Sequence, residues 1–208
     1  MIHTIVDKVK GLLINPVATF RQSKTDAPEA VFTYFGVILL VHAIFAAVMA
    51  TRWTGPQQGF AFMSWGNELP LMVFLMAIAG GFIFAIIFAA WLHLWVYLLG
   101  GRQGIMQTFK AIIYGHTPRL LLGWIPVIGF IFMLWSLVLG ILGIRELQEL
   151  STGKAILAFA IAILIPLILM ILLAAAFVAP YMATAGIPTP PTGTVIPQPM
   201  NIHLPPQP

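Results

Sequence analysis

The sequence predicts an all-α integral membrane protein, a bundle of five transmembrane helices with an N-terminal interfacial amphipathic helix. Three observations lead to this prediction: only 8% of the 208 residues are charged, 60% are hydrophobic, and the mean hydropathy is +0.99. A typical soluble domain carries roughly 25% charged residues, so this chain has too few charges to cover a globule in water. The chain also has no cysteine, which excludes disulfides, thiol catalysis and cysteine-ligated metals.

Residues 1–29 are expected to form a cytoplasmic amphipathic segment. Its apolar residues follow the i, i+3, i+4, i+7 spacing of one helix face: Ile2, Ile5, Val6, Val9, Leu12 and Leu13. Asp7, Lys8 and Lys10 lie on the opposite face, and Asn15-Pro16 ends the pattern. Such a helix either lies flat on the membrane surface or packs on the ends of the spans, and the sequence leaves both alternatives open.

The charged residues divide the remaining chain into apolar stretches, and a helix needs about 20 apolar residues to cross a bilayer. Four stretches meet this requirement, while a fifth is mostly apolar but contains Lys110, His116, Pro118 and Arg119. The predicted domain, residues 30–178, has spans near 30–50, 72–99, 104–123, 126–144 and 155–178.

The distribution of Lys and Arg decides between four and five spans. With a cytoplasmic N-terminus, four spans place seven of the ten Lys and Arg residues inside, and five spans place eight inside. Cytoplasmic loops carry an excess of these residues, so five spans are favoured in a multi-pass protein of the cell membrane. The uncharged tail, residues 179–208, then lies outside, and its many prolines predict disorder.

The third span carries a candidate polar cluster of Lys110, Tyr114, His116 and Arg119. Ionisable residues inside a membrane are costly and are functional hypotheses by default. In one alternative, Lys110 and Arg119 extend to the two membrane surfaces and only anchor the helix. In the other, Tyr114, His116 and Arg119 form a cluster inside the bundle that binds a substrate, a lipid headgroup or a partner helix.

Small residues recur every four positions in the second span and predict a helix-packing stripe: Ala77, Gly81, Ala85, Ala89 and His93. A stripe of this kind lets a second helix approach closely. That helix belongs either to the same chain or to another. The expected partners are therefore the lipid bilayer and either a second copy of the chain or another membrane protein.

No metal, cofactor or catalytic site is predicted. His42, His93 and His116 fall in spans, but no two stand at i, i+3 or i+4 and no carboxylate accompanies them. No serine–histidine–aspartate set or HExxH motif occurs, and both Asp residues precede the first span. We therefore expect no enzyme. The net charge of +4 suits membrane orientation better than nucleic-acid binding, so no nucleic-acid partner is expected.

Several short motifs follow one another in a distinctive order. They are Asn15-Pro16 with Phe20, Trp91-Leu92-His93-Leu94, Leu98-Leu99-Gly100-Gly101, Thr108-Phe109-Lys110-Ala111, Tyr114-Gly115-His116-Thr117-Pro118, Trp135-Ser136-Leu137-Val138 with Gly143, and Lys154-Ala155. Together these motifs, over roughly residues 8–178, resemble the Yip family, named for yeast membrane proteins that interact with Ypt/Rab GTPases.

The resemblance implies a polytopic, non-enzymatic membrane protein with a cytoplasmic N-terminus. The chain lacks the long polar N-terminal region of many eukaryotic relatives, so a prokaryotic-type member is expected, without the Rab partner. The expected function is a membrane scaffold or a trafficking or membrane-organisation factor. The alternative is a small transporter or channel subunit for an unidentified solute.

Overall fold

The computed structural model of the chain describes residues 2–52, 69–125 and 127–184, and the regular structure in these ranges is helical. The helices are α1 (Ile2–Ile14), α2 (Pro16–Gln22), the short 3₁₀ helix η1 (Ser23–Thr25), α3 (Pro28–Arg52), α4 (Leu69–Leu98), α5 (Ile105–Gly115), α6 (Thr117–Leu122), α7 (Ile128–Leu147) and α8 (Thr152–Thr184). The chain divides into two units, Met1–Leu164 and Ile165–Pro208.

Four of the described helices are long and apolar enough to cross a membrane. They are Pro28–Thr51, Pro70–Leu98, Ile128–Leu147 and Thr152–Val178. A helix of 20 residues is about 30 Å long, which matches the hydrocarbon core of a bilayer. The chain is therefore a multi-pass membrane protein, and the membrane class predicted from composition is confirmed.

The third predicted span, residues 104–123, is two short helices rather than one. α5 ends at Gly115 and α6 begins at Thr117, so neither helix is long enough to cross a membrane alone. The break lies beside Pro118, which has no N–H and whose ring clashes with the carbonyl of residue i−4, here Tyr114. Five transmembrane helices are thus not confirmed, since the described ranges contain four that qualify.

Side chains bond backbone groups on both sides of this break. His116 Nδ1 donates to the carbonyl of Ile112 at 2.8 Å, and the amide of Arg119 donates to Ser136 Oγ at 2.9 Å. Without water in the bilayer core, each unsatisfied backbone group costs several kcal/mol, so a broken helix needs such partners. The Ile112 carbonyl also accepts from the backbone amide of His116 at 2.9 Å, so Ser136 is the side chain that satisfies a backbone group opened by the break.

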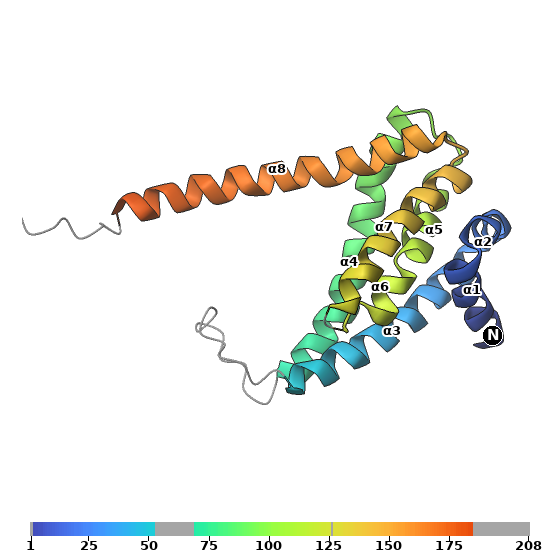
Figure 1. The fold of residues 1–208 in the computed structure, drawn as a ribbon, viewed down its shortest axis with the longest axis horizontal. Helices are drawn as coiled ribbons and strands as arrows, with labels where there is room; N and C mark the ends of the chain where they lie inside the picture. Colours follow the sequence, from blue (N-terminus) through green and yellow to red (C-terminus); the bar gives the residue numbers. More distant parts are fainter. Residues whose placement is uncertain (1, 53–68, 126, 185–208) are drawn as a thin grey trace, which may run out of the picture. The chain divides into compact units, whose positions relative to one another are not determined.

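The interior of unit 1 centres on α5, which packs against α4 and α7 (Figure 1). Residues 111–114 of α5 are at most 1% exposed, and Leu139 and Ile144 of α7 are fully buried. Two glycines approach each other closely, because a Cβ built on Gly115 would lie 2.9 Å from the Cα of Gly140. The backbones of α5 and α7 therefore meet without an intervening side chain.

The small-residue stripe of α4 faces α3 and α5. Ala85 and Ala89 are buried, and a Cβ on Gly81 would lie 2.6 Å from a methyl carbon of Leu39 on α3. At the other end of the stripe, His93 Nδ1 shares a hydrogen bond of 2.8 Å with Thr108 of α5. Gly81 and His93 of the stripe thus contact helices of the same chain.

The N-terminal segment folds back onto the rest of unit 1. α1 ends at Ile14, and the Asn15 side chain accepts from the Ala18 amide to cap α2, which starts with Pro16. Phe20 of α2 is fully buried against α7, where a Cβ on Gly143 would meet its ring at 2.9 Å. Phe20 therefore fixes α2 to the bundle by packing.

In the second unit, α8 continues from Ile165 to Thr184 without a charged residue. Residues 179–184, assigned to the tail by the sequence, are helical in the structure. The rest of the predicted tail, residues 185–208, lies outside the described residues.

We expect Gly115→Ala to lower the free energy of unfolding by about 1–3 kcal/mol, the usual cost of overpacking. The new methyl group would meet the backbone of α7, which cannot rotate away as a side chain can. The matched control is Gly36→Ala in α3, where a Cβ has no atom within 4 Å. Thermal unfolding of both variants in detergent measures the difference, and equal stabilities would contradict the close α5–α7 contact.

Candidate functional site

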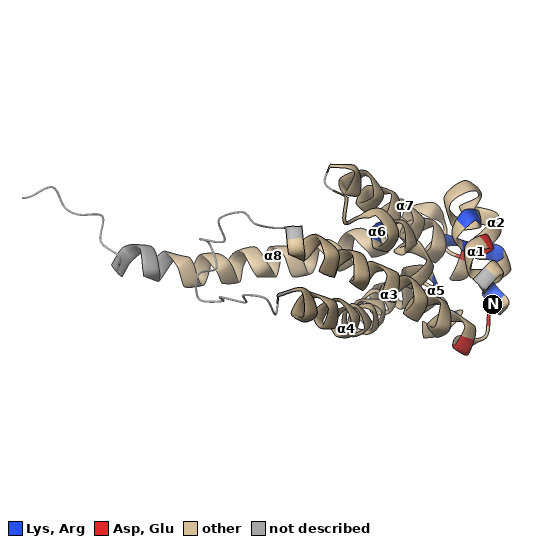
Figure 2. Ribbon diagram, turned by 90° about the horizontal axis from the view of Figure 1, so that it is seen from below, with Lys and Arg blue, Asp and Glu red and all other residues tan. Residues whose placement is uncertain are grey.

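Charged residues gather around α1 and α2 at one end of unit 1, which we name the charged end (Figure 2). Arg21 of α2 donates to Glu146 of α7 at 2.7 Å, and Lys24 of η1 donates to Glu149 at 2.6 Å. Arg21 and Glu149 are exposed, so each pair contributes little to stability. Their role is to orient the N-terminal segment against the end of α7.

Lys8, Asp26 and Tyr114 form a cluster, the Asp26 cluster, at the junction of α1, α3 and α5. Lys8 Nζ and the Tyr114 hydroxyl both donate to Asp26 Oδ2. The Lys8 ammonium also lies 4.7 Å from the centroid of the Tyr114 ring, within cation–π distance. One carboxylate thus connects α1 to α5.

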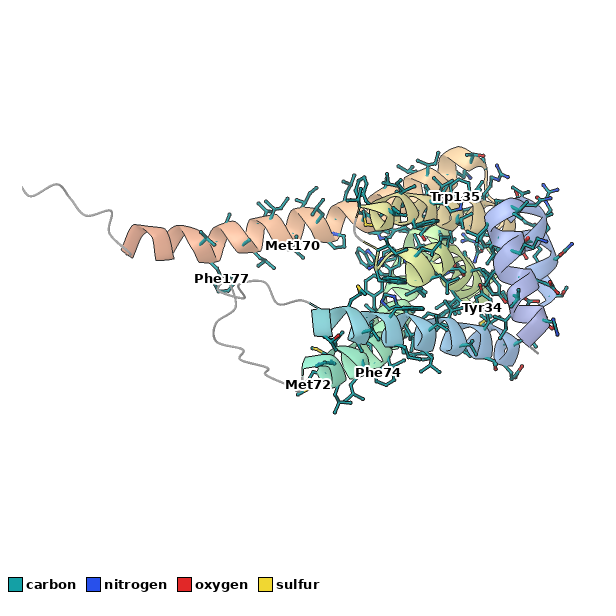
Figure 3. All side chains as sticks on the ribbon, turned by 60° about the horizontal axis from the view of Figure 1, so that its bottom comes forward. Tyr34, Met72, Phe74, Trp135, Met170 and Phe177 are labelled. Atoms are coloured by element: carbon teal, nitrogen blue, oxygen red, sulfur yellow. The ribbon has the colours of Figure 1, made fainter. Side chains whose placement is uncertain are left out.

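A second tyrosine extends this contact along α3. The Tyr34 ring meets the Tyr114 ring edge-on with centroids 5.1 Å apart, and its hydroxyl shares a hydrogen bond of 2.8 Å with Thr117 Oγ1. Figure 3 labels Tyr34 on α3, on the side toward α5 and α6. Both hydroxyls are therefore paired, which fits polar groups placed in an apolar interior.

Lys110 of α5 is directed to the charged end. Its side chain is buried, with the residue 3% exposed, and its Nζ donates to the carbonyl of Lys24 at 2.7 Å. Gln107 donates to the same carbonyl at 3.1 Å. Lys110 therefore joins α5 to η1.

A separate cavity of about 260 Å³, which we name the Arg119 cavity, lies between α3, α4, α5 and α6. Its polar and charged lining residues are His42, His116 and Arg119. The rest of the lining is apolar side chains and glycine: Phe35, Leu39, Ala77, Gly80, Gly81, Phe84, Ala85, Ile112, Ile113 and Leu120. The cavity thus combines one cation and two imidazoles with apolar walls.

The hydrogen bonds of the two imidazoles fix which ring nitrogen carries a proton. His42 Nδ1 contacts the carbonyl of Leu120 at 2.9 Å, and His116 Nδ1 contacts the carbonyl of Ile112 at 2.8 Å. A carbonyl can only accept, so Nδ1 is the donor in both rings. In each ring, Nε2 is the nitrogen left for a ligand.

Arg119 makes no ion pair with any residue that the structure describes. Its amide is held by Ser136, while its side chain is exposed at the rim of the cavity. The position of this cation is therefore set by the backbone of α6, and its guanidinium donors remain open to a ligand.

The structure places the four residues of the predicted polar cluster at two sites. Lys110 and Tyr114 contact the charged end, whereas His116 and Arg119 line the cavity. The sequence did not predict three residues that complete these sites: Lys8, Asp26 and His42. Asp26 meets Tyr114 across 88 positions of the chain, and no local pattern reports such a contact.

The three histidines of the spans have separate hydrogen-bond partners, and His93 does not line the cavity that His42 and His116 share. Across residues 2–52, 69–125 and 127–184, no group of three His, Asp or Glu residues is placed to hold a metal ion. Each of the three instead bonds a backbone carbonyl or a hydroxyl. Their observed role is to satisfy polar groups inside the bundle.

The family model described as Yip1 domain matches residues 10–179 of the chain. No curated protein and no solved structure matches it. The matched range begins within α1 and ends within α8, so it contains the whole lining of the Arg119 cavity. It also contains Asp26 and Tyr114 of the Asp26 cluster.

We expect Asp26→Asn to release α1 from the bundle. The change removes the ion pair with Lys8 and weakens the acceptor of Tyr114, and hydrogen bonds to charged groups contribute about 1.5–3 kcal/mol each. Amide hydrogen exchange in α1 should become about tenfold faster or more.

The matched control for this prediction is Asp7→Asn, which makes the same chemical change at an exposed position of α1. Exchange in α1 should keep its original rate in this variant. Equal exchange rates in the two variants would show that the Asp26 cluster does not hold α1.

Proposed function

This chain belongs to the Yip1 domain family, and from that membership we propose that it is a non-enzymatic membrane scaffold that recruits a partner protein or selected lipids to its charged end. In this role the protein is a trafficking or membrane-organisation factor. The bundle holds it in the bilayer, and the N-terminal segment presents the recruiting surface.

The observation that carries the proposal is the attachment of α1 and α2 to the bundle. The Asp26 cluster, the buried ring of Phe20 and the ion pairs with Glu146 and Glu149 hold this segment in a defined place. Two of its apolar residues stay exposed, Val6 at 57% and Ile14 at 72%. A surface that is fixed, amphipathic and partly apolar suits recruitment.

We place the charged end in the cytoplasm of a prokaryotic cell. Eight of the ten Lys and Arg residues belong to the N-terminal segment or to the sequence around the α4–α5 and α7–α8 connections. Cytoplasmic loops carry such an excess. The C-terminal tail then lies outside the cell membrane.

In this proposal α5 and α6 together form one further crossing, which is the third in chain order and adds to the four long helices. The two short helices comprise residues 105–122, which at 1.5 Å per residue extend about 27 Å, close to the thickness of the hydrocarbon core. Arg119 of α6 bonds Ser136 of α7, and Gln148, just after α7, bonds the Gly104 carbonyl just before α5. Helices α5 and α6 therefore run antiparallel to α7 along most of the length of α7.

A second candidate function is a small transporter or channel subunit. The observation in its favour is the Arg119 cavity, where a cation and two imidazoles lie inside the bundle. Polar groups inside a transmembrane bundle often mark a path for a solute. Flux of a solute into proteoliposomes that is lost in Arg119→Ala would support this candidate.

The topology is open to a direct test, because the chain has no cysteine and single-cysteine variants carry no background. We expect a membrane-impermeant maleimide to label Gln103→Cys and Ser151→Cys from the cytoplasmic side and Ile125→Cys from the other side. Ile131→Cys, on a 62% exposed position of α7, is the control that lipid should protect. Labelling of Ile125→Cys from the cytoplasmic side would show that α5 and α6 do not cross.

The scaffold role predicts that purification in mild detergent recovers a stoichiometric partner or a selected lipid. Ile14→Asn, which makes the exposed side of α1 polar, should reduce that recovery about tenfold, as for a central interface residue. The control is Val127→Asn, at a still more exposed aliphatic residue between α6 and α7, which is 87% exposed. If purification recovers neither a partner nor a selected lipid, and solute flux depends on Arg119, the second candidate would be favoured instead.

A further inference from the structure

The Arg119 cavity lies among the transmembrane helices, and Arg119 is three residues before the end of α6. His42, which lines the cavity, is ten residues before Arg52, so it lies roughly 15 Å along α3 from the end of that helix. Within the described residues no carboxylate pairs with Arg119. A cation among apolar transmembrane helices is costly unless an anion or water accompanies it.

We propose that the Arg119 cavity binds the phosphate headgroup of an anionic phospholipid. The guanidinium of Arg119 presents planar, charged N–H donors that match phosphate oxygens in pairs. The two imidazoles add Nε2 atoms, which donate to a phosphate oxygen when the ring is charged and accept from a hydroxyl of the glycerol headgroup when it is neutral. The site goes beyond the scaffold role and does not depend on recruitment at the charged end.

The apolar walls of the cavity would contact the apolar part of the ligand. Gly80 and Phe84 of α4 lie at the exposed rim, with Phe84 52% exposed, and both occupy the middle of a transmembrane helix. A ligand that enters there arrives from the lipid. This favours an amphiphile over a free phosphate ion, which would have to leave water to reach Arg119.

The size of the cavity fits part of a lipid. Pockets for drug-sized ligands measure roughly 300–1,000 Å³, and this cavity of about 260 Å³ is slightly smaller. It therefore accommodates the phosphate and the adjoining groups, while the acyl chains extend past the rim into the bilayer.

Two variant pairs separate this site from other cationic surfaces. Arg119→Gln removes the proposed phosphate ligand, and Arg102→Gln removes a cation at the α4–α5 connection, where Arg102 lies over the ring of Tyr97. Gly80→Leu fills the cavity, because a Cβ there meets no atom within 4 Å, and Gly36→Leu adds the same bulk at a position outside the lining.

The experiment is native mass spectrometry of the full chain, purified in detergent and mixed with equal amounts of phosphatidylglycerol and phosphatidylethanolamine. We expect preferential retention of phosphatidylglycerol, reduced about tenfold in Arg119→Gln, as for the loss of one charge-assisted interaction. Gly80→Leu should show a similar loss, while Arg102→Gln and Gly36→Leu should retain phosphatidylglycerol as the parent does.

Each outcome decides the proposal. Equal retention by Arg119→Gln and the parent overturns it, as does displacement of the lipid by excess inorganic phosphate, which would identify free phosphate as the occupant. If Arg119→Gln does not fold, the Gly80→Leu and Gly36→Leu pair decides, and equal retention by those two variants overturns the site. The measurement uses the purified chain, so failure to recruit a partner at the charged end leaves the result unaffected.

Discussion

The interior of this bundle depends on the interruption of the helix beside Pro118. A proline inside an apolar helix leaves backbone groups without partners, and the bilayer core offers no water to satisfy them. His116 and Ser136 supply hydrogen bonds on either side of the interruption, and His42 satisfies the carbonyl of Leu120. The polar side chains of this region are therefore explained first by the hydrogen bonds that they make near the interruption, before any function is assigned to them.

The same interruption sends polar side chains to two depths. Before it, Lys110 and Tyr114 reach back to the charged end, where they contact Lys24 and Asp26. After it, Arg119 lines a cavity among apolar walls. A bundle with one uninterrupted third helix would distribute these groups around a single axis, and the two sites would not be separated in the same way.

The N-terminal segment and the cavity illustrate two ways to accommodate charge in a protein that has little of it. At the charged end, Lys8 and Asp26 pair with each other, and exposed ion pairs orient α2 and η1. Arg119 has no such carboxylate among the described residues. Its charge is best explained by a ligand that brings the anion, and a lipid can do this from within the membrane.

Composition and hydropathy alone determined that this chain crosses a membrane several times, because charge scarcity and helix length are linear properties of the sequence. The order of the short motifs also indicated the Yip family. The tertiary structure decided what the linear pattern could not: that residues 104–123 form two helices, that Asp26 meets Lys8 and Tyr114, and that His42 joins His116 and Arg119. Hydropathy averages over a window and does not register one proline, and contacts across 88 residues exist only after the helices pack.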